Sequence, residues 1–216
     1  MQSTPQSQSS SNNPADKYSE ASKDGGSKKP QRKTPKPPKK ISERYLYNSG
    51  LHYLNRYAAS QHQFETVMRR KITRSLKHHK NMATDEAEKL LQDTVKKFQD
   101  LGFINDPAFA IGYMNSLHKR GFSKAKIRAK FAAKGLSAEL FDKAIDENNI
   151  GSDELWAALR YLQRKRKGPF RIKDGDETTS QREMAALARQ GFSYDIVKKA
   201  LELDEESALD ILNKRD

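Results

Sequence analysis

The sequence predicts an all-α fold in which three tandem three-helix repeats stack into an elongated, curved body behind a disordered N-terminal tail. From residue 41 onward, apolar residues recur at the three- and four-residue spacing of amphipathic helices, without the alternation typical of strands. Only two prolines, Pro107 and Pro169, lie beyond residue 41, and both stand where the apolar pattern of a helix is interrupted. A segment around Gly135 recurs around Gly191, which indicates internal repeats.

Residues 1–40 form the predicted tail. They hold six of the eight prolines, and their only hydrophobic residues are Met1, Ala15, Tyr18 and Ala21. Such a segment buries too little apolar surface to offset the entropy of ordering it, so it is predicted to be disordered. Its nine Lys and Arg against three Asp and Glu fit either a solubilising tail or an electrostatic arm for a polyanion.

The first helical repeat is assigned to residues 41–104. An apolar stripe from Phe64 to Leu76 predicts one helix, and a second stripe from Ala87 to Leu101, after Thr84 as N-cap, predicts the next. Both stripes are expected to lie in the core. Leu76 stands where the other repeats carry glycine, so the helix over the first stripe is expected to be longer than its counterparts.

The second repeat is assigned to residues 105–149 and the third to residues 150–216. Helix starts are predicted where a serine precedes an acid, at Ser137, Ser152 and Ser193. Helix ends are predicted at three glycines that follow basic residues, Gly121, Gly135 and Gly191.

The repeats are also visible in the alignment of the chain with itself. Residues 134–145 match residues 190–201 at an offset of 56, with identical Gly, Ser, Lys and Ala. A weaker copy places Met68–Ile72 over Ile127–Phe131 at an offset of 59. Because a unit this small cannot close a core alone, neighbouring repeats must stack.

Positive charge gathers in three segments that contain no Asp or Glu, one in each repeat: 69–80, 121–134 and 160–173. The candidate partner- or nucleic-acid-binding residues are Arg69, Arg70, Arg74, Lys124, Lys126, Arg128, Lys130, Lys134, Arg164, Lys165, Arg166 and Lys167. A single basic run is usually a solvated helix face, but three at related places favour a basic stripe along one concave face. Such a stripe would face DNA phosphates or an acidic protein surface. Phe170, in a basic loop, is the candidate for an exposed contact, whereas Phe122 is expected to pack.

The sequence gives no support for catalysis. It lacks cysteine, an HExxH motif, a phosphate-binding GxxxxGK[ST] loop and a GxSxG elbow. His78 and His79 are adjacent, so on a helix they point about 100° apart and cannot chelate one metal. We expect a non-enzyme with no catalytic residue, metal or cofactor. No apolar run is long enough for a membrane span and no secretory signal opens the chain, so a cytoplasmic monomer is expected.

Four stretches of the sequence carry a family resemblance. Gly102–Asp106, Arg120–Ser123 and Lys134–Gly135 resemble the central signature of the RecX family, and Ala188–Val197 resembles its C-terminal repeat. The likeness covers roughly residues 48–205, so residues 1–40 inherit nothing from it.

The resemblance implies three tandem three-helix repeats and a bacterial regulator of the RecA recombinase. Proteins of this family bind in the groove of the RecA–DNA filament. They inhibit its recombinase, ATPase and coprotease activities in DNA repair and the SOS response. The residues themselves leave open a sequence-independent nucleic-acid-binding protein without a RecA role, because the net charge of +13 supports both functions. Direct binding of single- or double-stranded DNA is open in either case.

Overall fold

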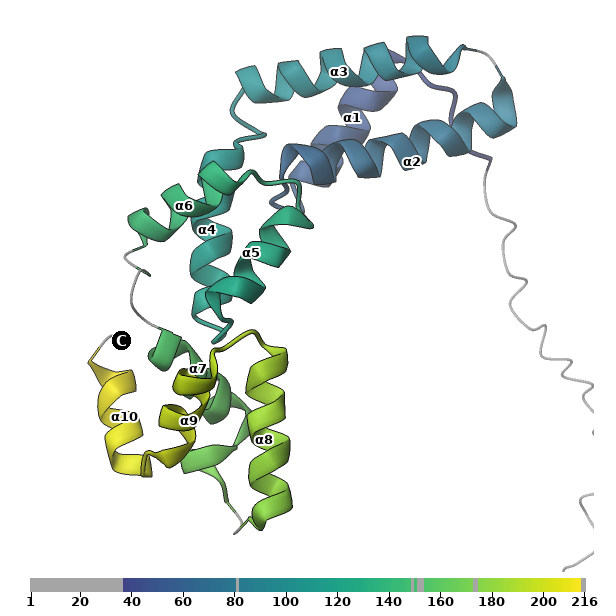
Figure 1. Cartoon of the computed structure of the whole chain (residues 1–216). Coiled ribbons are helices and arrows are strands. Elements are labelled where there is room, and N and C mark those ends of the chain that lie inside the picture. The colour runs from purple at the N-terminus through teal and green to yellow at the C-terminus, as the bar shows by residue number, and fades with distance from the viewer. Residues whose placement is uncertain (1–36, 81, 149, 151–153, 173–174, 215–216) are drawn as a thin grey trace, which may run out of the picture. The chain divides into compact units, whose positions relative to one another are not determined.

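The computed structural model describes residues 37–80, 82–148, 150, 154–172 and 175–214. Within these residues the chain forms ten α-helices and one 3-10 helix, with no β-strand (Figure 1). The predicted all-α class is therefore confirmed. Most of the predicted tail, residues 1–36, lies outside the described residues.

The first helical group contains α1 (Glu43–Leu54), α2 (Gln61–His79) and α3 (Thr84–Asp100). Its core includes the fully buried side chains of Phe64, Met68 and Phe98. At 19 residues, α2 is the longest helix described, as expected from the missing glycine. The prediction that Thr84 caps α3 is wrong: Ala83 is the N-cap and offers no side-chain acceptor, so the helix begins at Thr84 itself.

The folded part of the chain begins before residue 41. The backbone oxygen of Pro38 accepts a hydrogen bond from Nε2 of His79 at 2.5 Å, and that of Lys39 accepts from the hydroxyl of Ser75 at 2.7 Å. Ile41 follows with only 3% of its surface exposed. These contacts hold the last residues of the segment assigned to the tail against α2.

The second group contains α4 (Asp106–His118), α5 (Lys124–Ala132) and α6 (Ala138–Glu147). Ile127, Phe131 and Phe141 are buried in its core. Ser137 caps α6 as predicted, because its hydroxyl accepts from the backbone N–H of Leu140. Ile150 also packs into this core, one residue beyond the predicted boundary of the repeat.

The third group contains α7 (Glu154–Lys165), the 3-10 helix η1 (Gly168–Phe170), α8 (Glu177–Arg189), α9 (Tyr194–Glu202) and α10 (Glu205–Asn213). It thus has one α-helix more than the predicted three. The side chain of Asp204 caps α10 by accepting from the N–H of Ser207 at 2.8 Å, and the indole of Trp156 donates to the backbone oxygen of Leu212 at 3.4 Å.

Two of the predicted serine caps have different outcomes in this group. Ser193 is the N-cap of α9 but makes no side-chain capping hydrogen bond. Ser152 lies outside the described residues. The glycine predictions are confirmed, since Gly121, Gly135 and Gly191 have φ values of 71°, 70° and 88° after their helices.

Two junctions of the same design join consecutive groups. The hydroxyl of Ser60, the N-cap of α2, accepts from the N–H of Gln63 and donates to the backbone oxygen of Lys134 at 2.6 Å. The hydroxyl of Ser123, the N-cap of α5, likewise accepts from the N–H of Lys126 and donates to the backbone oxygen of Gln190. Each N-cap serine therefore links its helix to the turn of the next group.

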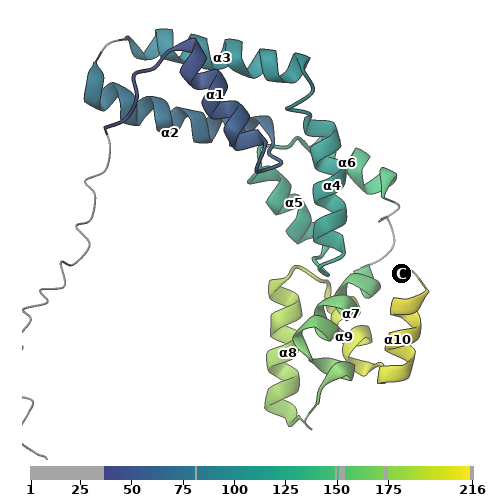
Figure 2. The ribbon, with the colours of Figure 1, turned by 180° about the vertical axis from the view of Figure 1, so that it is seen from behind.

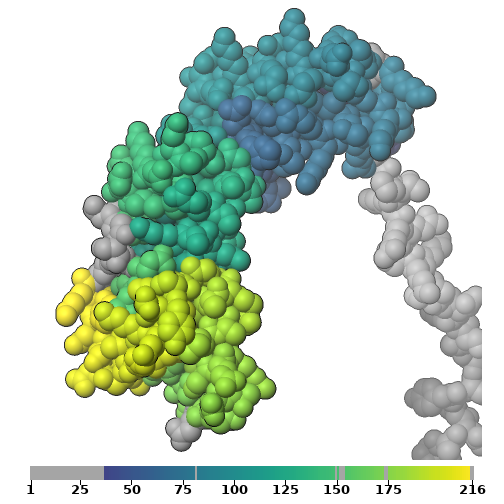
Figure 3. Space-filling view, viewed as in Figure 1, coloured from purple at the N-terminus to yellow at the C-terminus, as the bar shows by residue number. Residues whose placement is uncertain are grey.

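A carboxylate completes each junction. Oδ1 of Asp106, at the start of α4, accepts from the backbone N–H of Gln61 at 2.8 Å. Oε1 of Glu154, at the start of α7, accepts from the backbone N–H of Lys124 at 2.6 Å. Each acid thus accepts from a backbone N–H in the first turn of α2 or α5, where a negative charge also complements the helix dipole. The second group lies between the other two in both ribbon views and in the space-filling view (Figures 1, 2 and 3).

The junctions correct the alignment of the weakest repeat copy. The equivalent caps Ser60 and Ser123 are 63 residues apart, not 59, so Met68 takes the place of Phe131 rather than that of Ile127. The difference of four residues is one helical turn. Such a shift keeps an apolar stripe in phase, so the stripe alone did not fix the register.

Candidate functional site

The basic segment of the first group lies along α2. Arg70, Arg74 and Lys77 are exposed and, with Arg69, Thr66 and Thr73, line a surface hollow of about 540 Å³. The spacing of three and four residues places these side chains on one face of the helix. The opposite face buries Phe64 and Met68 in the core, so the basic face is turned outward by the packing of the apolar face.

Arg69, although predicted as a binding residue, is engaged inside the protein. Its guanidinium lies 2.9 Å from the carboxylate of Glu65 and 2.6 Å from that of Glu88, which comes from α3. The hydrogen bond from Arg69 lowers the pKa of Glu88, and the same bond raises the pKa of Arg69. The segment contains no acid in sequence, but the fold supplies one from a neighbouring helix.

The basic segment of the second group lies on α5 and the turn after it. Arg128 is 3.2 Å from Asp142 of α6 and stacks over the ring of Phe141 at 4.3 Å from its centroid. Lys130 lies over Phe122, and Lys134 over Tyr113, a residue whose pKa is raised by burial. These cations contribute to the packing of the group as well as to its charge.

Lys124 and Lys126 open α5 at the junction with the third group. Both are partly buried, and the backbone N–H of each makes a capping hydrogen bond, to Glu154 and Ser123 respectively. Their backbones are therefore fixed by the junction.

The basic segment of the third group covers the second half of α7 and the turn after it. The guanidinium of Arg164 donates to the backbone oxygen of Arg120 at 2.7 Å. Arg166 adopts a left-handed backbone with φ of 52°, and the N–H of Lys167 bonds to the oxygen of Leu162, so these two residues end the helix. Arg164 and Lys165 lie in the last turn, where positive charge complements the helix dipole.

The structure places the turn after α4, where the second basic segment begins, beside the third basic segment. A hollow of about 300 Å³ is lined by Arg120, Phe122, Tyr161, Arg164, Lys165 and Gln190. Arg120 was not among the predicted residues, although it precedes Gly121 in the sequence. Its guanidinium lies 5.1 Å from the centroid of the Phe122 ring. Three cations and two rings thus share this hollow, and no carboxylate is among the residues that line it.

Phe170 does not fulfil its predicted role. It is only 9% exposed and belongs to the core of the third group. The turn that carries it is held by Glu183, whose carboxylate accepts from the N–H of Gly168 at 3.0 Å and pairs with Arg171 at 2.6 Å. The proline and glycines of this loop indicated exposure, but Gly168 and Pro169 form a tight 3-10 turn that directs the ring inward. Phe122 is partly buried against its own core, as expected.

The described residues contain no group of three or more His, Asp or Glu side chains that could hold a metal ion. His79 contacts the backbone of Pro38, and the ring of His118 stacks on Trp156 at 4.6 Å between centroids. Among the helices that the structure describes, none is long and apolar enough to cross a membrane.

Comparison with known proteins places the chain in a family, although no family model matches it. The regulatory protein RecX of Myxococcus xanthus (strain DK1622) is 38% identical over 179 residues, which cover 82% of this chain and 95% of that protein. The regulatory protein RecX of Agrobacterium fabrum (strain C58) is 27% identical over 77% of this chain and 86% of its own length.

A solved structure agrees with the fold. The crystal structure of a regulatory protein RecX aligns with a TM-score of 0.50 over 74% of this chain and 72% of that one, at 17% identity, which speaks for the fold alone. Since the sequence identity extends over nearly the whole Myxococcus protein and the fold is shared with a solved relative, this chain belongs to the RecX family of regulatory proteins.

Proposed function

We propose that this chain binds the RecA–DNA filament and inhibits the recombinase, ATPase and coprotease activities of RecA in DNA repair and the SOS response. The observation that carries the proposal is the 38% identity to a regulatory protein RecX over 95% of that protein. The basic hollows on α2 and between the turn after α4 and α7 support it, because a filament groove offers phosphates and acidic side chains as partners.

The proposed mechanism is binding without chemistry. The basic surfaces of the helical groups contact neighbouring RecA protomers or the DNA between them. The serine and carboxylate hydrogen bonds of the junctions connect the groups, so contacts made by one group restrain the others. A protein held across several protomers opposes the movements and additions that ATP turnover and filament growth need. The protein acts as a cytoplasmic monomer in this account.

A titration of RecA ATPase on single-stranded DNA tests the function. The full chain is expected to lower the ATPase rate at amounts well below one per RecA protomer, since one bound molecule affects a run of protomers. A protein that only competes for DNA must instead be added in amounts comparable to the DNA sites. Inhibition that appears only at such amounts would contradict the proposed contact with the filament.

The second candidate function, direct nucleic-acid binding without a RecA role, is favoured by the hollow that combines Arg120, Arg164 and Lys165 with two aromatic rings. Cations that track a backbone and rings that stack on bases are the usual elements of single-strand binding. This function predicts that the chain binds an unstructured oligonucleotide in the absence of RecA, with an affinity that falls steeply with salt.

A further inference from the structure

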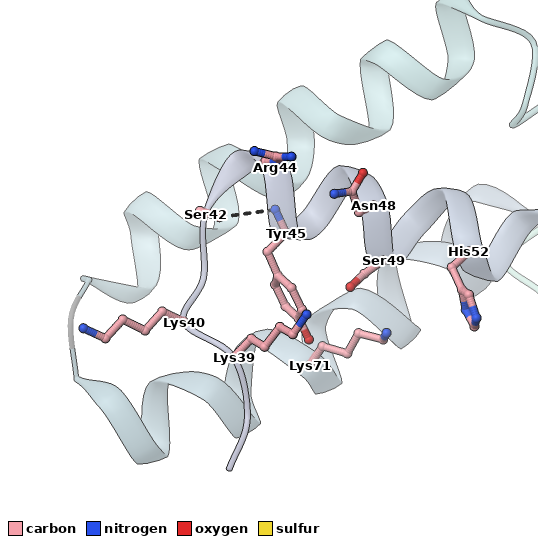
Figure 4. A pocket seen from close by; sticks show the side chains of 9 residues that line it. All are labelled: Lys39, Lys40, Ser42, Arg44, Tyr45, Asn48, Ser49, His52 and Lys71. Atoms are coloured by element: carbon pink, nitrogen blue, oxygen red, sulfur yellow. Dashed lines mark hydrogen bonds between the residues drawn. The ribbon is translucent and has the colours of Figure 1, made fainter. Parts of the chain in front are cut away.

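A pocket of about 490 Å³ lies between the N-terminal segment, α1 and α2, and of the three basic segments described above it includes only Lys71 (Figure 4). In Figure 4 the Lys39 ammonium lies beside the Tyr45 hydroxyl, the Lys71 side chain extends along the same pocket, and the hydroxyl of Ser49 points toward this space. Lys40 and Arg44 belong to the rim of the pocket and point away. None of the described residues that line it is Asp or Glu.

The combination of groups selects the ligand. Two ammonium groups from separate segments, a phenol and an aliphatic hydroxyl are all hydrogen-bond donors to an anion, and no lining carboxylate neutralises the lysines. A phosphate oxygen accepts from all of these donors. Each lysine acts as a flexible point charge, which suits a backbone phosphate that carries one negative charge.

The pocket is formed in advance. The backbone of Lys39 is fixed to α2 by the hydroxyl of Ser75, and Ile41 anchors the next turn of chain in the core. Ser42 caps α1 by accepting from the N–H of Tyr45 at 3.2 Å, and the Tyr45 side chain packs against the first core. The donors therefore start from fixed positions, which lowers the entropic cost of binding.

We propose that this pocket holds a phosphate of a single-stranded nucleic acid and makes the first helical group a direct nucleic-acid contact. The surroundings of the pocket favour a strand over a small phosphate compound. The exposed Lys40 and Arg44 lie at the rim and point away from the pocket (Figure 4). A strand that leaves the pocket can use these charges, whereas a single phosphate group held inside it cannot. The inference rests on the second candidate function and is independent of RecA.

The test is the binding of a fluorescent oligothymidylate of fifteen nucleotides to the full chain, measured by fluorescence anisotropy over a range of salt concentrations. The double variant K39A/K71A is compared with K89A/K96A, which removes the same charge from two exposed positions of α3. We expect the pocket variant to bind roughly fivefold more weakly than the control, with a salt slope smaller by about 0.7, the value for one single-strand phosphate. Tyr45→Phe, which keeps the packing and removes the hydroxyl, should weaken binding about twofold.

A second measurement uses the unmodified sequence. Acetylation of lysines, followed by mass spectrometry, should show Lys39 and Lys71 protected by the oligonucleotide, and Lys89 and Lys96 unprotected. Equal affinities of the two double variants, or unchanged acetylation of Lys39 and Lys71, would overturn the pocket while leaving nucleic-acid binding intact. Release of the oligonucleotide by millimolar inorganic phosphate at constant ionic strength would show a site for free phosphate and overturn the assignment to a strand. Failure of the parent to bind would overturn both the pocket and the second candidate function.

Discussion

At the scale of single residues, two glycines with the same backbone conformation have different surroundings. Gly121 and Gly102 have φ values of 71° and 73°. A Cβ added at Gly121 would lie 2.5 Å from the backbone nitrogen of Tyr161 and 2.7 Å from the backbone oxygen of Ala157, whereas one at Gly102 would meet nothing within 4 Å. Gly121 therefore allows the turn after α4 to approach α7.

This pair gives a matched prediction. Gly102→Ala should cost about 1–2 kcal/mol, the price of a left-handed backbone for a residue with a side chain. Gly121→Ala should cost clearly more, because backbone atoms of α7 must also move. Urea unfolding of the two variants measures the difference. Equal free energies of unfolding would mean that the turn and α7 are not in close contact.

The candidate residues show why charge in sequence is an incomplete guide to a binding site. Arg69 and Arg128 were predicted as binding residues because segments 69–80 and 121–134 contain no acid, yet Glu88 and Asp142 reach them from other helices. Such partners are set by tertiary packing, which residue order alone does not reveal. By contrast, the burial of Phe98 and Phe131 was predictable, because helical periodicity places them directly on apolar faces.

At the scale of the helix, the core residues carry the stability of each group. Phe98 and Phe131 are 0% and 1% exposed. Replacement of either by Ala should cost about 3–5 kcal/mol in the free energy of unfolding, since it leaves a cavity in a packed interior. Leu101→Ala is the control: the prediction that the end of this stripe is buried is wrong, since Leu101 is 54% exposed, and the change should cost less than about 1 kcal/mol. A Phe variant that behaves like the control would remove that residue from the core.

The junctions yield an element-scale prediction that the sequence alone did not suggest. Ser123→Ala removes both the cap of α5 and the hydrogen bond to the Gln190 carbonyl. Ser137→Ala removes a cap alone, since the hydroxyl bonds to Leu140 within its own helix region. We expect the free energy of unfolding, measured with denaturant, to fall by about 1 kcal/mol for Ser137→Ala and by about 2 kcal/mol for Ser123→Ala. If Ser123→Ala lowers the free energy of unfolding by no more than Ser137→Ala does, the hydrogen bond across the junction does not stabilise the protein.

The repeat logic explains which features were visible beforehand. A glycine after a basic helix end is a local signal, and it predicted the turns at Gly121, Gly135 and Gly191. A hydroxyl before an acid is a weaker signal, because it predicted the cap at Ser137 but was wrong for Thr84. The extra helix α10 and the one-turn shift of the first repeat copy could not be predicted from such signals. In sequence, Glu205 and Glu206 fit a solvated tail as well as the first turn of a helix. The structure places them in the first turn of α10, directly after the N-cap Asp204, where their charge complements the helix dipole.

At the scale of the whole molecule, residues 37–40 are expected to contribute to stability, because Pro38 and Lys39 bond to α2. Removal of residues 1–36 should leave the free energy of unfolding nearly unchanged. Removal of residues 1–40 deletes the acceptors of Ser75 and His79 and should cost about 1–2 kcal/mol. Thermal or denaturant unfolding of the two truncations, with helical content recorded by circular dichroism, measures this. Equal stability of both would show that Pro38 and Lys39 do not stabilise the first group.

The central claim is that exposed cations of this chain inhibit RecA filaments. The charge variant must avoid residues that hold the fold together, and Arg128 pairs with Asp142 while Lys124 lies at the junction with Glu154. The exposed face of α2 offers Arg70, Arg74 and Lys77 instead. Their change to Ala keeps helix propensity and should alter stability by no more than about 0.5 kcal/mol per residue.

The most direct measurement is the ATPase rate of RecA on single-stranded DNA, titrated with the parent, the R70A/R74A/K77A variant and the K89A/K96A control. We predict inhibition by the parent and the control at amounts well below one per RecA protomer. The α2 variant should require at least about tenfold more protein while remaining folded, corresponding to about 1.4 kcal/mol of lost binding free energy. A folded α2 variant that inhibits RecA as well as the parent would contradict the account.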